Sequence, residues 1–171
     1  MQAEAAIPDD TGLRAHAEAL GLALIAAGIR IAVAESCTGG WLAKACTDIP
    51  GSSDWFEAGF VTYSNAAKAQ LLGVSELVLD ANGAVSEAVV REMADGARRF
   101  ADTAAAIAIS GVAGPGGGTP DKPVGLVWMA WSLGDREWTE RLILAGDREA
   151  VRRQAVDRAI LGLLENLRDP A

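Results

Sequence analysis

The 171-residue sequence has little lysine, histidine, cysteine or aromatic side chain. With three lysines and a net charge of −8, it lacks the basic surface that phosphate contacts require, so we expect no nucleic-acid partner. The two cysteines, Cys37 and Cys46, have no histidine close in sequence, which argues against a zinc site. We therefore expect reduced thiols and no metal or other cofactor.

Long apolar runs are also missing. The longest, such as residues 20–29 and 104–109, are far shorter than the roughly 20 residues that a membrane-spanning helix needs. The N-terminus lacks the basic start and apolar run of a secretory signal, so we expect a cytoplasmic protein without membrane contact. Half of the residues are hydrophobic and 34 are alanine, which predicts one domain with closely packed helices.

Apolar periodicity predicts an alternation of helices and strands. The predicted helices run from near Thr11 to Gly28, over 41–47, 65–72 and 87–101, and onward from Asp147; the predicted strands cover 31–34, 59–63, 104–109, 124–133 and 137–144. The last two strands form an antiparallel hairpin. This order predicts a layered α/β domain with a mixed sheet over residues 11–166, and flexible segments at 1–10 and 167–171.

The first candidate site is Ala34–Gly40 (AESCTGG), in which hydroxyls and glycines follow a buried strand and precede a helix. Ligands bind at such strand ends in open α/β sheets, and backbone N–H groups at a helix start favour an anion or a developing oxyanion. The segment predicts a nucleophile site or a phosphate cradle. The alternative is an ordinary Ser/Thr helix cap with a glycine turn.

The second candidate site is Tyr63–Lys68 (YSNAAK), where a strand end and the first turn of a helix would bring the chain's one tyrosine near a lysine. A neutral lysine amine can accept the proton of a serine hydroxyl. Neutrality requires burial or a nearby positive charge. The one histidine, His16, falls inside the first predicted helix, which favours Ser-Lys over Ser-His chemistry. The alternative is a solvated lysine beside a tyrosine at the edge of the core.

The third candidate site is the glycine-rich stretch Ser110–Pro120, whose backbone N–H groups can form an anion-binding nest. Farther along, Arg148 follows the helix-capping Asp147 and is able to meet a phosphate with two hydrogen bonds. The alternatives are a flexible crossover loop and a surface ion pair.

Six segments together resemble the CinA C-terminal domain family. They are 34–40 (AESCTGG), 59–68 (GFVTYSNAAK), 83–87 (GAVSE), 109–118 (ISGVAGPGGG), 122–127 (KPVGLV) and 146–152 (GDREAVR). The resemblance covers residues 11–166 and implies a three-layer α/β/α sandwich with a mixed sheet. The length resembles that of the stand-alone members, which hydrolyse the carboxamide of nicotinamide mononucleotide to nicotinate mononucleotide and ammonia.

The resemblance also implies roles for individual residues. Ser36 would be the nucleophile, with Tyr63 and Lys68 handling its proton. The candidate substrate-binding residues are Cys37, Thr38, Gly39, Gly40, Asn65, Ser110, Gly111, Gly114, Gly116, Thr119 and Arg148. We also expect a homodimer, formed through exposed Trp41, Trp55 or Trp138. Two alternatives stay open: a non-catalytic nucleotide- or partner-binding module linked to competence or DNA damage, and a Ser-Lys hydrolase of another small amide.

Overall fold

The computed structural model describes residues 7–168 of the chain. In chain order its elements are α1 (Asp10–Ala27), β1 (Ile31–Glu35), α2 (Trp41–Thr47), the 3₁₀ turn η1 (Ser52–Asp54), β2 (Phe56–Val61), α3 (Asn65–Leu72), α4 (Glu76–Asn82), α5 (Glu87–Ala101), β3 (Ala105–Gly111), β4 (Leu126–Leu133), β5 (Arg136–Ile143) and α6 (Arg148–Arg168).

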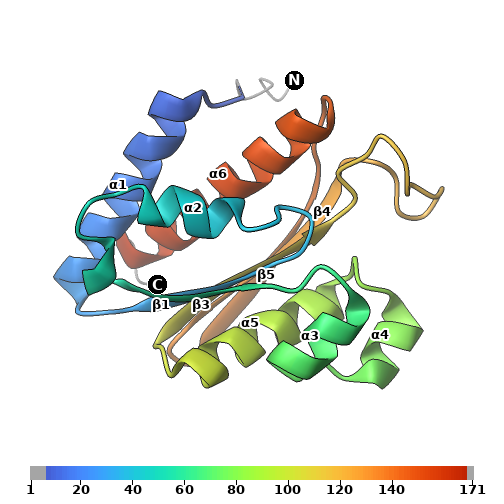
Figure 1. Cartoon of the computed structure of the whole chain (residues 1–171), viewed down its shortest axis with the longest axis horizontal. Helices are drawn as coiled ribbons and strands as arrows, with labels where there is room; N and C mark the ends of the chain where they lie inside the picture. The colour runs from blue at the N-terminus through green and yellow to red at the C-terminus, as the bar shows by residue number, and fades with distance from the viewer. Residues whose placement is uncertain (1–6, 169–171) are drawn as a thin grey trace.

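One mixed sheet organises these elements, with the strand order β2-β1-β3-β4-β5. Strand β1 pairs in parallel with β2 and β3, whereas β4 is antiparallel to both β3 and β5. Helices α1, α2 and α6 cover one face of the sheet, and α3, α4 and α5 cover the other (Figure 1). The predicted three-layer α/β/α sandwich with a mixed sheet is confirmed.

The two faces of the central strands carry side chains of different size. On β1, Ile31 and Val33 point into the core that α1, α2 and α6 cover, and Ala32 and Ala34 point into the core beneath α5. Strand β3 repeats the alternation with Ile107 between alanines. Because side chains alternate along a strand, alanine on one face lets α5 approach the sheet closely. The high alanine content thus has a structural role.

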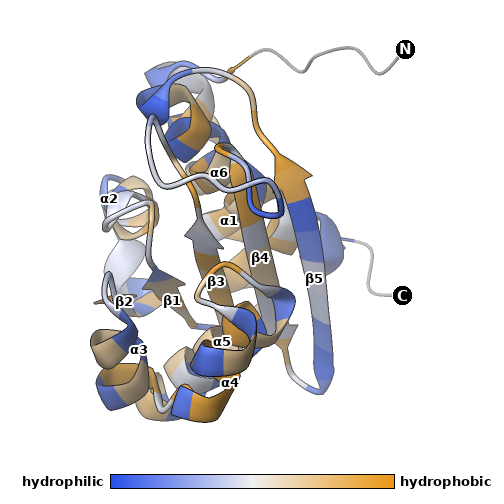
Figure 2. Cartoon of the chain, turned by 90° about the vertical axis from the view of Figure 1, so that its right-hand side faces the viewer, coloured by the Kyte–Doolittle hydropathy of each residue, from blue (hydrophilic) through white to orange (hydrophobic). Residues whose placement is uncertain are grey.

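The edge strand β5 is largely hydrophilic, apart from its apolar C-terminal end (Figure 2). Its burial alternates between partly buried and exposed residues along most of its length. This alternation is typical of a strand that has solvent on one side, and charged side chains on an edge strand discourage pairing with other chains.

The first helix follows the sequence prediction closely. The Asp9 carboxylate accepts a hydrogen bond from the Gly12 N–H, and Gly28 ends α1 in the left-handed conformation. Leu13, Ala17 and Leu20 lie on its buried face, as their spacing predicts. His16 also lies on α1, where its Nδ1 is 2.6 Å from Oδ1 of Asp157 on α6, remote from the loops considered above.

Several local predictions were wrong. Helix α4 was missed, because Leu79 alone of its seven residues is buried and the helix has no apolar stripe at helical spacing. Ser64, rather than Asn65, caps α3 through the Ala67 N–H. Trp55, expected at an exposed dimer surface, is only 1% exposed and packs against Gly21. The spacing of Phe100 from Val89, Met93 and Ala97 predicts that it lies on the buried face of α5, but it is 57% exposed.

The predicted domain limits differ slightly from the helix ends. Helix α1 begins at Asp10, and α6 continues through Arg168, two residues beyond the expected end of the domain. The remainder of both segments for which we predict flexibility, 1–6 and 169–171, lies outside the described residues. Within residues 7–168, no helix combines the length and apolar character needed to cross a bilayer.

Candidate active site

The candidate site lies where three neighbouring parallel strands end. Ser36 directly follows β1, Tyr63 comes two residues after β2, and Ser110 and Gly111 close β3. Since β1 lies between β2 and β3, the carboxyl ends of the three strands meet at one edge of the sheet. This is the position at which open α/β sheets bind ligands.

Ser36 and Lys68 are in direct contact at this edge. The Lys68 Nζ lies 2.9 Å from the Ser36 Oγ and donates a second hydrogen bond of 2.7 Å to the Thr62 carbonyl. Helix α3 carries Lys68 one turn after its Ser64 cap, so the amine points back toward the end of β1. The predicted proximity of serine and lysine is therefore present in the structure.

Burial determines the protonation of Lys68. The side chain is fully buried, and no carboxylate within the described residues pairs with it. Removing an ammonium from water disfavours its charged form. Desolvation thus lowers the pKa of Lys68 to about 8, which makes a neutral amine accessible near neutral pH.

Tyr63 has a different partner from the one that a proton relay requires. Its side chain is 62% exposed, and its hydroxyl oxygen accepts a hydrogen bond of 3.2 Å from Nη2 of Arg148. Arg148 also donates a hydrogen bond of 2.7 Å to the Gly114 carbonyl. The Arg148 guanidinium therefore connects the end of β2 to the glycine-rich loop. Ser36 is hydrogen-bonded to Lys68 directly rather than through Tyr63.

These groups surround a cavity of about 300 Å³, near the lower limit for small-molecule sites. Of the predicted residues, it brings together Ser36, Cys37, Tyr63, Lys68, Ser110, Gly111, Gly114, Gly116 and Arg148. Sequence reasoning missed Ala84 and Val85, which also line it, whereas the lining residues Val112, Ala113 and Gly117 belong to the predicted stretch Ser110–Pro120 without having been selected individually. The segment GAVSE was a signal for the first two, and the Ser110 hydroxyl fixes this segment by donating to the Ala84 carbonyl at 2.8 Å.

The other predicted binding residues lie outside this cavity. Thr38 is fully buried, Gly39 and Gly40 line a different cavity, and Asn65 is exposed at the start of α3. Thr119 is exposed, and its hydroxyl accepts a hydrogen bond from the Lys122 N–H. Adjacency in sequence misled the prediction, because the chain turns away from the cavity after Cys37.

The start of α2 is not open to a ligand, contrary to the prediction. Glu35 is fully buried, and its carboxylate accepts hydrogen bonds from the N–H groups of Leu42 and Ala43 at 2.8 and 3.0 Å. The Trp41 N–H donates to the Thr38 carbonyl. The last residue of β1 therefore caps the next helix and fixes both ends of the intervening loop.

The loop itself retains two N–H groups beside Ser36. The Gly39 N–H donates to the Ser36 carbonyl within the turn, whereas no backbone or side-chain acceptor within residues 7–168 is recorded for the N–H of Cys37 or of Thr38, apart from the Cys37 sulfur. Arg152, a residue that sequence reasoning did not select, donates to the carbonyls of Cys37 and Thr38 at 3.1 and 3.0 Å. In a trans peptide the C=O and N–H groups point in opposite directions, so the N–H groups of Thr38 and Gly39 point away from α6.

The cysteines do not compete with Ser36 as nucleophiles. Cys37 and Cys46 are buried and unbridged, and burial raises the pKa of the Cys37 thiol to about 11. Desolvation likewise raises the pKa of Cys46. A thiol is reactive as its thiolate, so both are inert at neutral pH. Among residues 7–168, no cluster of three or more histidine, cysteine, aspartate or glutamate side chains has a metal-binding arrangement.

The chain is similar to known proteins over most of its length. The sequence model of the CinA C-terminal domain matches residues 13–167. A protein of Escherichia coli K12 named nicotinamide-nucleotide amidohydrolase PncC is 55% identical over 152 residues, which cover 88% of this chain and 92% of that protein. A protein of the same name from Pseudomonas putida is 56% identical over 136 residues, covering 80% and 85% of the two chains.

Solved structures extend the likeness to three dimensions. A CinA superfamily protein from Klebsiella pneumoniae superposes with a TM-score of 0.89 at 42% identity, covering 91% of this chain and 98% of that one. A competence/damage-inducible protein from Agrobacterium tumefaciens gives the same TM-score at 36% identity, covering 95% and 98%. On the evidence of sequence and fold together, the chain belongs to the CinA C-terminal domain family.

Proposed function

We propose that this protein is an amidase that hydrolyses the carboxamide of nicotinamide mononucleotide to nicotinate mononucleotide and ammonia. The observation that carries the proposal is the 2.9 Å contact between the Ser36 Oγ and the buried Lys68 Nζ inside a cavity of ligand size. The similar proteins named nicotinamide-nucleotide amidohydrolase support this choice of substrate.

In the proposed first step, neutral Lys68 accepts the Ser36 proton as Oγ attacks the amide carbon. The resulting tetrahedral oxyanion needs preorganised donors, and the N–H groups of Cys37 and Thr38 are those adjacent to the nucleophile. Arg152 holds the Cys37 carbonyl and so orients the Thr38 N–H in the same peptide unit. The hydrogen bond from the Gly39 N–H to the Ser36 carbonyl orients the peptide unit that carries the Cys37 N–H, so both donors are fixed before the substrate binds.

The proton on Lys68 then serves the leaving group. Transfer to the amide nitrogen allows ammonia to depart, which leaves an acyl ester on Ser36 and a neutral lysine. Water attacks this ester while Lys68 accepts its proton, and the proton returns to Ser36 as the acid product leaves. The cycle consumes one water and requires neither histidine nor metal in its proton steps.

Arg148 is the proposed phosphate ligand. It lines the cavity and donates to Tyr63 and Gly114, and arginine binds phosphate with two parallel hydrogen bonds. Tyr63 then orients Arg148 at the mouth of the site rather than acting as the base. The glycine-rich loop, of which Ser110, Gly111, Gly114 and Gly116 line the cavity, borders the ribose.

The decisive experiment follows ammonia and nicotinate mononucleotide after nicotinamide mononucleotide is added to the wild type and to Ser36→Ala. We expect turnover by the wild type and a loss of at least about 10³-fold in the variant, with an unchanged circular dichroism spectrum. Binding without turnover by the wild type would favour a nucleotide-binding module, and turnover of other amides alone would favour a different Ser-Lys hydrolase. A fully active Ser36→Ala would refute the nucleophile. The homodimer and the cytoplasmic location remain predictions.

A further inference from the structure

A second and larger cavity lies beyond the catalytic loop, bounded by α1, α2 and α6. Its volume is about 630 Å³, against about 300 Å³ for the cavity that contains Ser36. Gly39 and Gly40, which were predicted to serve the catalytic site, line this cavity instead. Volumes of this size are typical of small-molecule sites. Nothing in the mechanism proposed above uses it.

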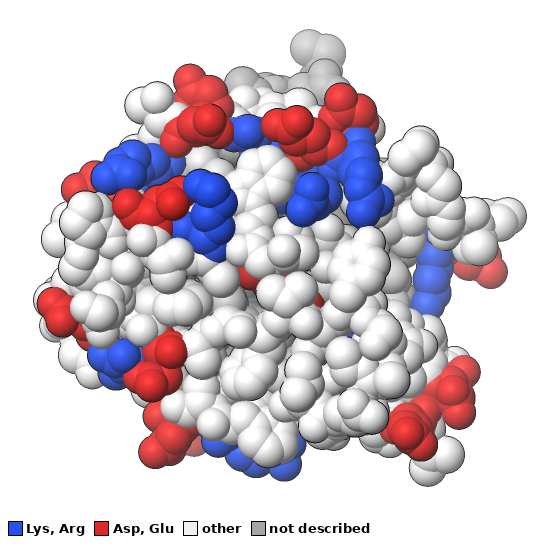
Figure 3. Space-filling model, viewed as in Figure 1, with Lys and Arg blue, Asp and Glu red and all other residues white. Residues whose placement is uncertain are grey.

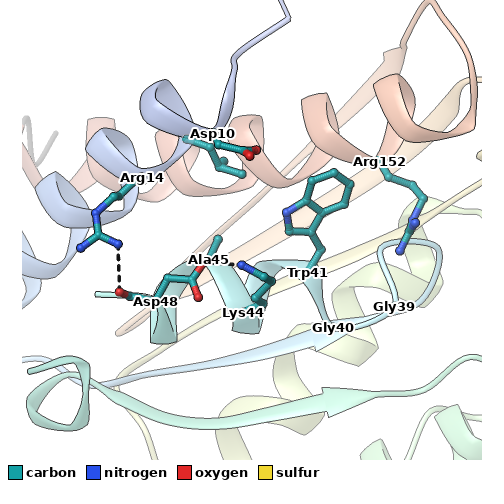
Figure 4. A pocket seen from close by; sticks show the side chains of 10 residues that line it. Asp10, Arg14, Gly39, Gly40, Trp41, Lys44, Ala45, Asp48 and Arg152 are labelled. Atoms are coloured by element: carbon teal, nitrogen blue, oxygen red, sulfur yellow. Dashed lines mark hydrogen bonds and ion pairs between the residues drawn. The ribbon is translucent and has the colours of Figure 1, made fainter. Parts of the chain in front are cut away.

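Two arginines face this cavity and pair with no carboxylate of residues 7–168. Arg14 donates from Nη1 to the backbone carbonyl of Asp48 at 3.1 Å, and no other acceptor of its guanidinium is recorded within the described residues. Within the described part of the chain, Arg152 donates hydrogen bonds to the carbonyls of Cys37 and Thr38 and to no side chain. Figure 4 shows the two side chains at opposite ends of the cavity, with Trp41 between them.

The acidic side chains of the same cavity already have partners. Asp48 pairs with Lys44, and Asp10 pairs with Arg153, each at 2.5 Å. Figure 3 shows this face of the molecule, on which acidic and basic side chains lie beside one another in the upper part of the view. In a chain of net charge −8, two guanidinium groups that no described carboxylate neutralises provide local attraction for an anion in this cavity.

Part of the cavity wall is apolar. Leu13 and Ala45 contribute nearly buried side chains, and half-buried Trp41 forms a wall. A tryptophan beside arginines suits a flat ring, because indole and guanidinium planes both stack on aromatic systems. The cavity therefore combines a surface for a ring with donors for an anionic group.

We infer that this cavity is a second ligand site, which takes an anionic mononucleotide. Its phosphate is held by the exposed Arg14. Its base lies at the edge of Trp41, beside the guanidinium groups of Arg152 and Arg153, which lie 5.5 and 4.9 Å from the centroid of the indole ring. The ligand also contacts Arg152, which holds the carbonyls of Cys37 and Thr38. The site is separate from the cavity of Ser36 and does not depend on the proposed amidase activity.

Calorimetric titration with AMP, inorganic phosphate and adenosine tests the inference. We expect AMP to bind the wild type, and phosphate or adenosine alone to bind more weakly. Arg14→Gln removes one charge-assisted phosphate contact and should weaken AMP binding about tenfold or more. Arg14 is exposed, and glutamine is a good helix former, so the fold should be unaffected.

Two further variants locate the ligand. Arg148→Gln alters the catalytic cavity and should leave AMP binding unchanged, as should Arg30→Gln, which alters an arginine that pairs with Glu57 outside both cavities. The inference is overturned if the wild type does not bind AMP, or if Arg14→Gln binds it as the wild type does. It is also overturned if Arg148→Gln, and not Arg14→Gln, abolishes binding, because AMP then occupies the catalytic cavity.

Discussion

The Nζ of Lys68 lies between the hydroxyl of Ser36 and the carbonyl of Thr62, at 2.9 and 2.7 Å, with no carboxylate paired to it among the described residues. Both neighbours are neutral, so they orient the amine without stabilising its charge as an anion would. The arrangement thereby joins proximity to a nucleophile with a lowered pKa. Both the pH dependence of the reaction and that of the stability should therefore reflect the titration of Lys68.

The pH dependence of the amidase reaction should report this amine. Because the pKa of Lys68 is lowered to about 8 and the base must be neutral, kcat/KM should rise nearly tenfold per pH unit below that value and level off above it. The measurement is the initial rate of ammonia release between about pH 6.5 and 9.5 at low substrate concentration. A profile that is flat through pH 8 would contradict Lys68 as the base.

The same lowered pKa predicts a pH-dependent stability. Between about pH 8 and 10.5 the unfolded state keeps a proton on Lys68 that the folded state has lost, so stability rises with pH there. Lys68→Met has no amine at this position and so lacks this pH dependence. Across this range, the free energy of unfolding of the wild type should therefore rise by up to about 3 kcal/mol relative to that of the variant. Urea titrations of the wild type and the variant at pH 7 and 10.5 measure the two unfolding free energies. If their difference is the same at both pH values, the pKa of Lys68 is not lowered.

Arg148→Gln should impair substrate binding more than chemistry. Loss of a charge-assisted contact with phosphate is expected to raise KM about tenfold or more, with a smaller fall in kcat, because Ser36 and Lys68 remain in place. Arg91→Gln is a matched control, since it removes an arginine that pairs with Glu87 and Glu137 on the surface. A large loss of kcat at unchanged KM would place Arg148 in the chemical step instead.

Gly96 tests the close approach of α5 to α3. A Cβ built at this position lies 2.0 Å from the Leu72 carbonyl oxygen, so Gly96→Ala forces the helices apart. We expect a loss of about 2 to 3 kcal/mol in unfolding free energy, which corresponds to roughly 5 to 10 °C in Tm. Gly12→Ala is the control, because its nearest contact would be an ordinary 3.4 Å. Equal melting temperatures for the two variants would disprove the predicted clash.

Short-range signals in the sequence account for most of the fold. Alternation and capping predict the five strands and five of the six α-helices, because Asp9, Gly28 and Gly73 act on residues within a few positions of themselves. Helix α4, which was missed, has Leu79 as its one buried side chain, so its apolar pattern is weak. Trp55 was misplaced because its partner Gly21 is 34 positions away.

The candidate site, like the fold, could be predicted only in part from local sequence patterns. Local sequence patterns identify the segments that carry reactive groups: a serine after a buried strand, a lysine one turn into a helix and a glycine-rich loop. How these groups lie relative to one another depends on the folded arrangement. It set Lys68 against Ser36, joined Tyr63 to Arg148, closed the start of α2 with Glu35, and turned Gly39 and Gly40 toward a second cavity. The physical reason is that strand order and helix packing depend on contacts between distant segments, which local spacing does not encode.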